Sequence, residues 1–133
     1  MPSSIITDAA PPLAPFAVSL GDPAGIGPEI VAKSWVMREA RGLPPFFAVG
    51  DAASLRAVWL GPVVRIDSPE EAAAVFPTAL PCLQVGEAGE IVPGTPGTDG
   101  ARVAFQALEV AVGLARSGSA AGIVTAPVGK EQL

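Results

Sequence analysis

The chain has 133 residues, half of them hydrophobic, and is therefore long enough to bury a core of its own. A net charge of −5, with Lys and Arg scattered along the chain, excludes the basic face of a nucleic-acid binder and the cationic patch of a protein that binds anionic membranes. The sequence contains no histidine, which excludes Ser-His-Asp and Cys-His catalysis and histidine-ligated zinc sites built from this chain alone.

The first residues, 1–15, lack the basic segment and the long apolar run of a signal peptide, and prolines interrupt them. We therefore expect a flexible leader. No apolar run reaches the roughly 20 residues that span a bilayer, so a cytoplasmic protein with no membrane partner is expected. The single cysteine, Cys82, lies in the apolar run "ALPCLQV" and is expected to be a small buried residue rather than a reactive thiol.

The first half of the chain alternates short apolar runs with helical patterns. The apolar runs predict buried strands over 16–20, 46–50 and 63–66. A helix is expected to open with Pro28 at its first position and to continue to Gly42, a residue type that often ends helices. A second helix is predicted over 51–61, with Asp51 as its N-terminal cap.

The middle of the chain predicts one more short helix and one more strand. "SPEEAAAVF" should form the helix, because Ser68 is a good cap and Pro69 suits a first helical position. A strand is expected over 80–85, followed by an irregular loop over 86–98 that is rich in glycine and proline.

The longest predicted helix covers 98–118 and leads into a last strand over 122–128. The apolar residues expected near one face of this helix are Val103, Leu108, Val112 and Ala115. Strands that alternate with helices at this spacing predict an α/β domain over 16–133, a three-layer α/β/α arrangement with a mostly parallel sheet. Ligand loops usually lie just beyond strand tips, where this chain stops, so we expect it to be truncated.

The turn "GDPAGIGPEI", residues 21–30, is the first candidate site. Its glycines follow a G-x-x-x-G-x-G spacing, which fits neither the Rossmann fingerprint nor the phosphate-binding P-loop. A strand end, a glycine turn and a helix N-terminus still form a place that favours an anion. Alternatively, the glycines only build a tight connection that needs positive φ. Asp22 either caps the turn through its own backbone or hydrogen-bonds a substrate or cofactor.

The second candidate site is "TAPVGK", residues 125–130, at the carboxyl end of the last predicted strand. Ligands of open parallel sheets bind beyond this end of the strands. The Thr125 hydroxyl and the Lys130 ammonium would suit a phosphate or a carboxylate there. The alternative is a solvated lysine and a threonine that bonds a strand-end carbonyl.

Taken together, "SLGDPAGIGPEI" and "GIVTAPVGKEQL" resemble the 4-hydroxythreonine-4-phosphate dehydrogenase (PdxA) family. The shorter core "GIGPE" also resembles the opening of the isocitrate and isopropylmalate dehydrogenases, which share the broader fold, but Pro23 and Ala24 favour the first family. Gly129 departs from the family pattern, in which Asn or His is common at that position. The resemblance covers nearly all of this chain but less than half of a typical member, and so implies an N-terminal portion.

The resemblance implies a homodimeric enzyme of pyridoxal phosphate biosynthesis. Its reaction would be the NAD- or NADP-dependent oxidation and decarboxylation of 4-phosphohydroxy-L-threonine, a small phosphorylated substrate, to 3-amino-2-oxopropyl phosphate. The family holds a divalent metal with histidines that follow the "TAPV" loop, so the ligands are expected outside this chain and the fragment is expected to be inactive alone.

The resemblance also implies roles for a few residues. Lys130 and Thr125, with Asp22 as a weaker candidate, would bind substrate. Gly25, Ile26 and Gly27 would border the cofactor, and no catalytic acid, base or metal ligand is assigned. Two alternatives stay open: a related dehydrogenase of another phosphorylated hydroxy acid or of a cis-dihydrodiol, and a non-catalytic α/β module that binds an anion.

Overall fold

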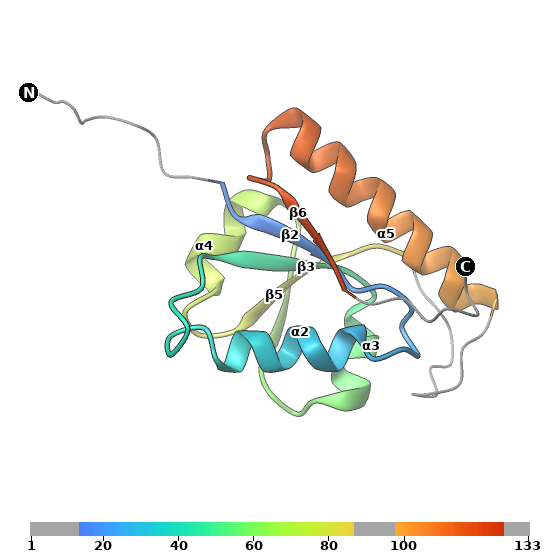
Figure 1. Ribbon diagram of the computed structural model, residues 1–133, viewed down its shortest axis with the longest axis horizontal. Helices are drawn as coiled ribbons and strands as arrows, with labels where there is room; N and C mark the ends of the chain where they lie inside the picture. Colours follow the sequence, from blue (N-terminus) through green and yellow to red (C-terminus); the bar gives the residue numbers. More distant parts are fainter. Residues whose placement is uncertain (1–13, 87–97, 127–133) are drawn as a thin grey trace, which may run out of the picture.

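The computed structural model describes residues 14–86 and 98–126, and within them the strands form a single parallel sheet (Figure 1). The order across this five-stranded sheet is β4-β5-β3-β2-β6. The strands are β2 (Phe16–Ser19), β3 (Phe46–Gly50), β4 (Val63–Ile66), β5 (Leu80–Gln84) and β6 (Ile123–Thr125). Each strand was predicted within a few residues, and the parallel sheet is confirmed. The predicted leader and the loop after β5 lie mostly outside the described residues.

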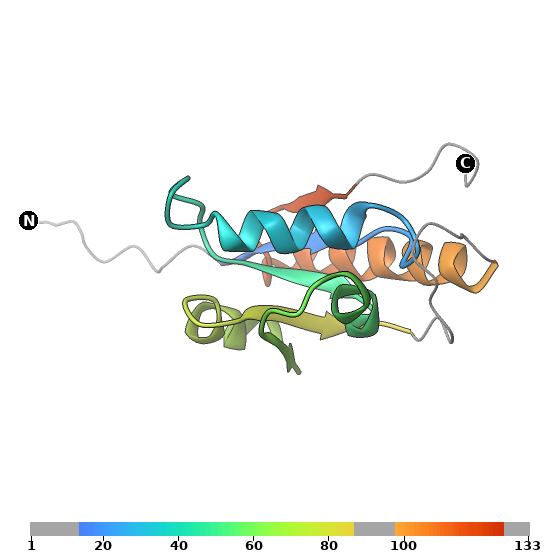
Figure 2. The same ribbon diagram turned by 90° about the horizontal axis from the view of Figure 1, so that it is seen from below.

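Helices cover both faces of the sheet, as predicted. The helices are α2 (Gly27–Val36), α3 (Ala52–Val58), the 3₁₀ turn η1 (Pro69–Glu71), α4 (Ala72–Val75) and α5 (Thr98–Ser117). Successive residues of β3 point to opposite cores: Ala48 packs with α2 and α3, whereas Phe47 and Val49 pack with α5 and α4. In Figure 1, α5 runs beside β2 and β6, and Figure 2 shows the same layers from below.

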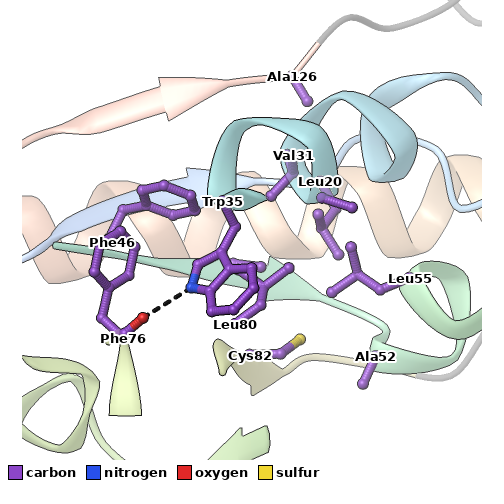
Figure 3. Packing of buried hydrophobic residues seen from close by; sticks show 12 residues of the cluster. Leu20, Val31, Trp35, Phe46, Ala52, Leu55, Phe76, Leu80, Cys82 and Ala126 are labelled. Atoms are coloured by element: carbon purple, nitrogen blue, oxygen red, sulfur yellow. Dashed lines mark hydrogen bonds between the residues drawn. The ribbon is translucent and has the colours of Figure 1, made fainter. Parts of the chain in front are cut away.

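The core between the sheet and helices α2 and α3 is built around Trp35 (Figure 3). Its indole Nε1 donates a hydrogen bond of 2.9 Å to the Phe76 carbonyl, which ties α2 to the end of α4. Cys82 is fully buried in the same core, as predicted. Burial, helped by the negative charge of Asp51, raises the pKa of the Cys82 thiol to about 12.

The end of α2 was predicted wrongly. The helix stops at Val36 rather than near Gly42, and turns follow it from Met37 onwards. The Arg38 guanidinium donates to the carbonyls of Trp35 (2.9 Å) and Pro77 (2.6 Å), so one local and one long-range bond of this side chain compete with continuation of the helix. The start is also shifted by one residue: Gly27 begins the helix and Pro28 is its second residue.

The short helix after β4 begins as a 3₁₀ turn and becomes α-helical only at Ala72. The Glu71 carboxylate accepts hydrogen bonds from the N–H groups of Asp67 (2.8 Å) and Ser68 (3.0 Å). These bonds hold the helix start in place, as expected for a capping arrangement at Ser68.

The buried face of α5 was predicted correctly only at Val103. Its fully buried residues are Val103, Ala107 and Ala111, whereas Leu108 and Val112 are half-buried. Small side chains let this helix approach the sheet closely, and the larger apolar residues flank the contact rather than forming it.

Candidate functional site

The loop after β2 forms a tight turn at the carboxyl edge of the sheet. The Gly25 N–H donates to the Asp22 carbonyl at 2.9 Å, which closes the turn. Gly21 has φ 77°, so the expected need for positive φ is met there. Gly25 and Gly27 do not have positive φ, and another physical reason must account for them.

Asp22 lies almost wholly inside the protein, with 2% of its surface exposed. Its Oδ1 accepts the Ala24 N–H at 2.8 Å, so the capping role is confirmed. The same oxygen would lie 2.7 Å from a Cβ atom added at Gly100, in the first turn of α5. The other oxygen, Oδ2, is buried and has no hydrogen-bond partner within residues 14–86 and 98–126. Asp22 therefore joins the turn to α5 and leaves one acceptor unused.

Gly27 brings the two candidate motifs into direct contact. A Cβ atom added at Gly27 would lie 2.1 Å from the Leu20 carbonyl oxygen and 2.9 Å from the Ala126 Cβ. The Ala126 N–H also donates to the Ser19 carbonyl at 2.9 Å. Segments about a hundred residues apart in the sequence thus meet at one corner, and Gly27 is required there by close approach.

The N-terminus of α2 begins without a side-chain cap, and its first two residues, Gly27 and Pro28, are buried. Ile26 occupies its N-cap position, makes no side-chain cap and is 61% exposed, while Gly25 beside it is half-buried. The first N–H groups of a helix without a side-chain cap can bind an anion or a polar ligand. The features of this corner therefore fit approach by a phosphate-bearing cofactor.

Thr125 lies at the end of β6, next to this corner, and is exposed. Its register partner on β2 is Ser19. Lys130 lies outside the described residues, so its predicted position beside Thr125 stays a prediction.

A polar network at the ends of the neighbouring strands β3 and β5 was predicted only in part. Asp51 caps α3, as predicted, by accepting the Ala53 N–H at 3.1 Å. The Gln84 amide at the end of β5 donates to Asp51 Oδ1 (3.1 Å) and accepts the Ala52 N–H (2.9 Å). Gln84 was not singled out, although a polar residue that ends an apolar strand is a usable signal. The contact of Gly100 with Asp22 has no local signal in the sequence.

The described residues do not fit the divalent metal that the family resemblance implies. Among residues 14–86 and 98–126, no three His, Cys, Asp or Glu side chains are grouped so that they could hold a metal ion. The same part of the chain has no helix that is both long enough and apolar enough to cross a bilayer.

Comparison with known proteins identifies the family of the chain. The family model described as pyridoxal phosphate biosynthetic protein PdxA matches residues 43–133. The 4-hydroxythreonine-4-phosphate dehydrogenase of Zymomonas mobilis is 52% identical over 119 residues, which are 90% of this chain and 36% of the relative.

Solved structures agree with this match. The enzyme of the same name from Klebsiella pneumoniae has a TM-score of 0.74 at 30% identity, covering 90% of this chain and 38% of that one. The one from Burkholderia phymatum has a TM-score of 0.76 at 27% identity, covering 92% and 38%. The chain thus spans little more than a third of the length of these relatives. Because the family model matches more than half of its residues, the chain belongs to the PdxA family.

Proposed function

We propose that this chain is the N-terminal portion, over residues 16–133, of an NAD- or NADP-dependent 4-hydroxythreonine-4-phosphate dehydrogenase. The observation that carries the proposal is the packing of Gly27 against Ala126, which unites both family motifs at the carboxyl edge of the sheet. Ligands of parallel α/β sheets bind at this edge. The names of the relatives support the choice of activity.

The proposed reaction transfers a hydride from the carbon that bears the secondary hydroxyl of 4-phosphohydroxy-L-threonine, and the hydroxyl proton is released as the ketone forms. The resulting β-keto acid loses carbon dioxide and gives 3-amino-2-oxopropyl phosphate, a step in pyridoxal phosphate biosynthesis. NAD or NADP, when bound, supplies the hydride acceptor. We assign no step to a metal, because the described residues do not fit one.

The residues of this chain would bind and orient the reactants. Lys130 would bind the substrate through its positive charge, with the exposed Thr125 hydroxyl beside it. Gly25 and the exposed Ile26 would border the cofactor at the start of α2, and Gly27 would shape that border by its close packing. Asp22 would hold the turn; its Oδ2 has no hydrogen-bond partner among the described residues but is buried, so it would accept a bond from the substrate only if the turn opens.

Catalysis by this portion alone is not expected. The sequence has no histidine, and the matched relatives extend far beyond the part that this chain covers. We propose that the metal ligands lie in that further part, and that the complete enzyme is a cytoplasmic homodimer.

The test uses this chain co-expressed with the part of the Zymomonas mobilis relative that lies outside the match, here called the complementary fragment. The purified pair is assayed for NAD and NADP reduction with a divalent ion and a panel of substrates: 4-phosphohydroxy-L-threonine, other phosphorylated hydroxy acids and a cis-dihydrodiol. The proposal expects the first substrate to be preferred. Preference for another substrate would move the assignment to a related dehydrogenase, and a pair that binds phosphate without any turnover would favour the non-catalytic module.

Lys130→Ala tests the substrate site within the same pair. Loss of a charge-assisted contact should raise the KM for the phosphorylated substrate by about 10- to 100-fold. Lys33→Ala is the matched control, because Lys33 is the other lysine of the chain and forms an exposed ion pair with Glu29 on α2. Equal KM values for the two variants would remove Lys130 from the site.

A further inference from the structure

The turn that follows β2 buries a carboxylate without satisfying it. Asp22 is 2% exposed, yet its Oδ2 has no hydrogen-bond partner within residues 14–86 and 98–126. Buried polar atoms of folded proteins are nearly all hydrogen-bonded, because an unpaired atom loses its water without compensation. The loss is larger for a charged group than for a neutral one, so the observed position of Asp22 carries a free-energy cost at this oxygen.

The hydrogen bonds that close the turn both depend on Asp22. Its carbonyl accepts the Gly25 N–H at 2.9 Å, and its Oδ1 accepts the Ala24 N–H at 2.8 Å. Both bonds are local, since donor and acceptor lie two or three residues apart. A motion of Asp22 would therefore release the turn as a unit.

The chain on either side of the turn limits this motion. The Leu20 N–H donates to the Val49 carbonyl of β3 at 3.0 Å, which anchors the chain just before the turn. After the turn, Gly27 is held by its close approach to the Leu20 carbonyl. Between these fixed points Gly21 has φ 77°, and a glycine allows the backbone rotation that a moving turn requires.

The first turn of α5 packs directly on the Asp22 carboxylate. A Cβ atom added at Gly100 would lie 2.7 Å from Asp22 Oδ1 and 3.2 Å from Asp22 Cγ, so the carboxylate occupies the space that a larger residue would fill. The first turn of a helix carries a partial positive charge, which favours a carboxylate there. The buried position is thus held by a contact that glycine permits and by the attraction of the helix end, against the cost of the unpaired oxygen.

We propose that residues 22–25 form a latch with two states. In the closed state, which the structure shows, the Asp22 carboxylate packs against Gly100. In the open state the carboxylate leaves α5, and Oδ2 accepts hydrogen bonds from water or from a ligand. A hydroxyl or ammonium group of a ligand reaches Oδ2 only in the open state, so such a ligand shifts the balance towards opening. The latch is a property of this chain and does not rest on the proposed reaction.

Amide hydrogen exchange, followed by NMR, measures opening of the latch directly. The Ala24 N–H is buried and hydrogen-bonded, so in a rigid turn it would exchange as slowly as an amide of the central strand β3, such as that of Val49. We expect the protection factor of Ala24 to be at least about 100-fold lower than that of Val49. Equal protection of the two amides would overturn the proposal.

Two substitutions should shift the latch in opposite directions. Gly100→Ala places a methyl group 2.7 Å from Asp22 Oδ1 and should lower the protection of Ala24 by at least about tenfold. Asp22→Asn keeps the shape of the side chain but replaces the unpaired charged oxygen with a neutral group that costs less to bury, so the protection of Ala24 should rise at least about threefold. Gly113→Ala is the control in the same helix, because nothing lies within 4 Å of its added Cβ, and it should leave Ala24 unchanged.

The protection of Val49 in each variant shows whether the sheet stays folded. Lower protection of Ala24 in the Asp22→Asn variant would overturn the proposal, because Asp22 would then act only as a cap of the turn. Unchanged protection in a folded Gly100→Ala variant would overturn it as well, since the contact with α5 would not hold the latch. If Gly100→Ala unfolds the sheet, the wild-type comparison and Asp22→Asn decide the outcome.

Discussion

Replacing Gly27 by alanine should disrupt the corner at which the two family motifs meet. The added Cβ would lie 2.1 Å from the Leu20 carbonyl oxygen, although carbon and oxygen atoms normally stay about 3.3 Å apart. It would also lie 2.9 Å from the Ala126 Cβ. The nearest obstacle is backbone rather than a flexible side chain, so the strand end and the helix start must separate by about 1 Å.

Overpacking of this kind costs about 3 kcal/mol or more, which for a chain of this length lowers Tm by roughly 10 °C. Gly25→Ala is the control in the same turn. Its Cβ would lie 3.3 Å from the Asp22 carbonyl oxygen and its φ is not positive, so the expected cost is below about 1 kcal/mol. Urea unfolding followed by the fluorescence of Trp35 and Trp59, which pack together near the α2 core, measures both changes. Equal unfolding free energies for the two variants would refute the claim that close approach demands glycine at position 27.

Two further predictions concern stability. Gly113 lies in α5 with nothing within 4 Å of an added Cβ, so Gly113→Ala should stabilise the protein by about 0.5–1 kcal/mol, seen as a higher urea midpoint; an unchanged or lower midpoint would contradict this. For Cys82, the pKa rises from 9.0 to about 12 on folding, so only the unfolded chain ionises between these values, and the free energy of unfolding should fall as pH rises from about 9 towards 12. Cys82→Ala should lack this contribution, and an identical pH dependence in the variant would show that other groups cause the fall.

The alternation of strands and helices could be predicted from local patterns, because each signal is contained in a few consecutive residues. Asp51 shows this well, since a cap is defined by its own side chain and the next two residues. The end of α2 could not be predicted in this way. Arg38 binds the carbonyl of Pro77, which lies 39 residues further along the chain, and no local pattern contains that contact.

In the candidate site, too, local features could be predicted from the sequence and contacts between distant residues could not. The strand-turn-helix corner around Gly27 was recognisable, but the reason for the glycine was not, because Ala126 comes from a distant strand. The contact between Asp22 and Gly100 likewise depends on how α5 docks. The face of α5 was misjudged since hydrophobicity favours leucine and valine, whereas close packing on the sheet selected Ala107 and Ala111.

The most direct measurement is NADH or NADPH formation, followed by absorbance, from 4-phosphohydroxy-L-threonine and a divalent ion. It compares this chain alone, the complementary fragment alone and the two combined. We propose that this chain holds residues that bind substrate and cofactor and that the part outside it holds the metal ligands. Together with the family assignment, this predicts turnover only when the two fragments are combined, in parallel with formation of their complex. Turnover by this chain alone, or a stable complex that never reduces the cofactor with this substrate, would contradict it.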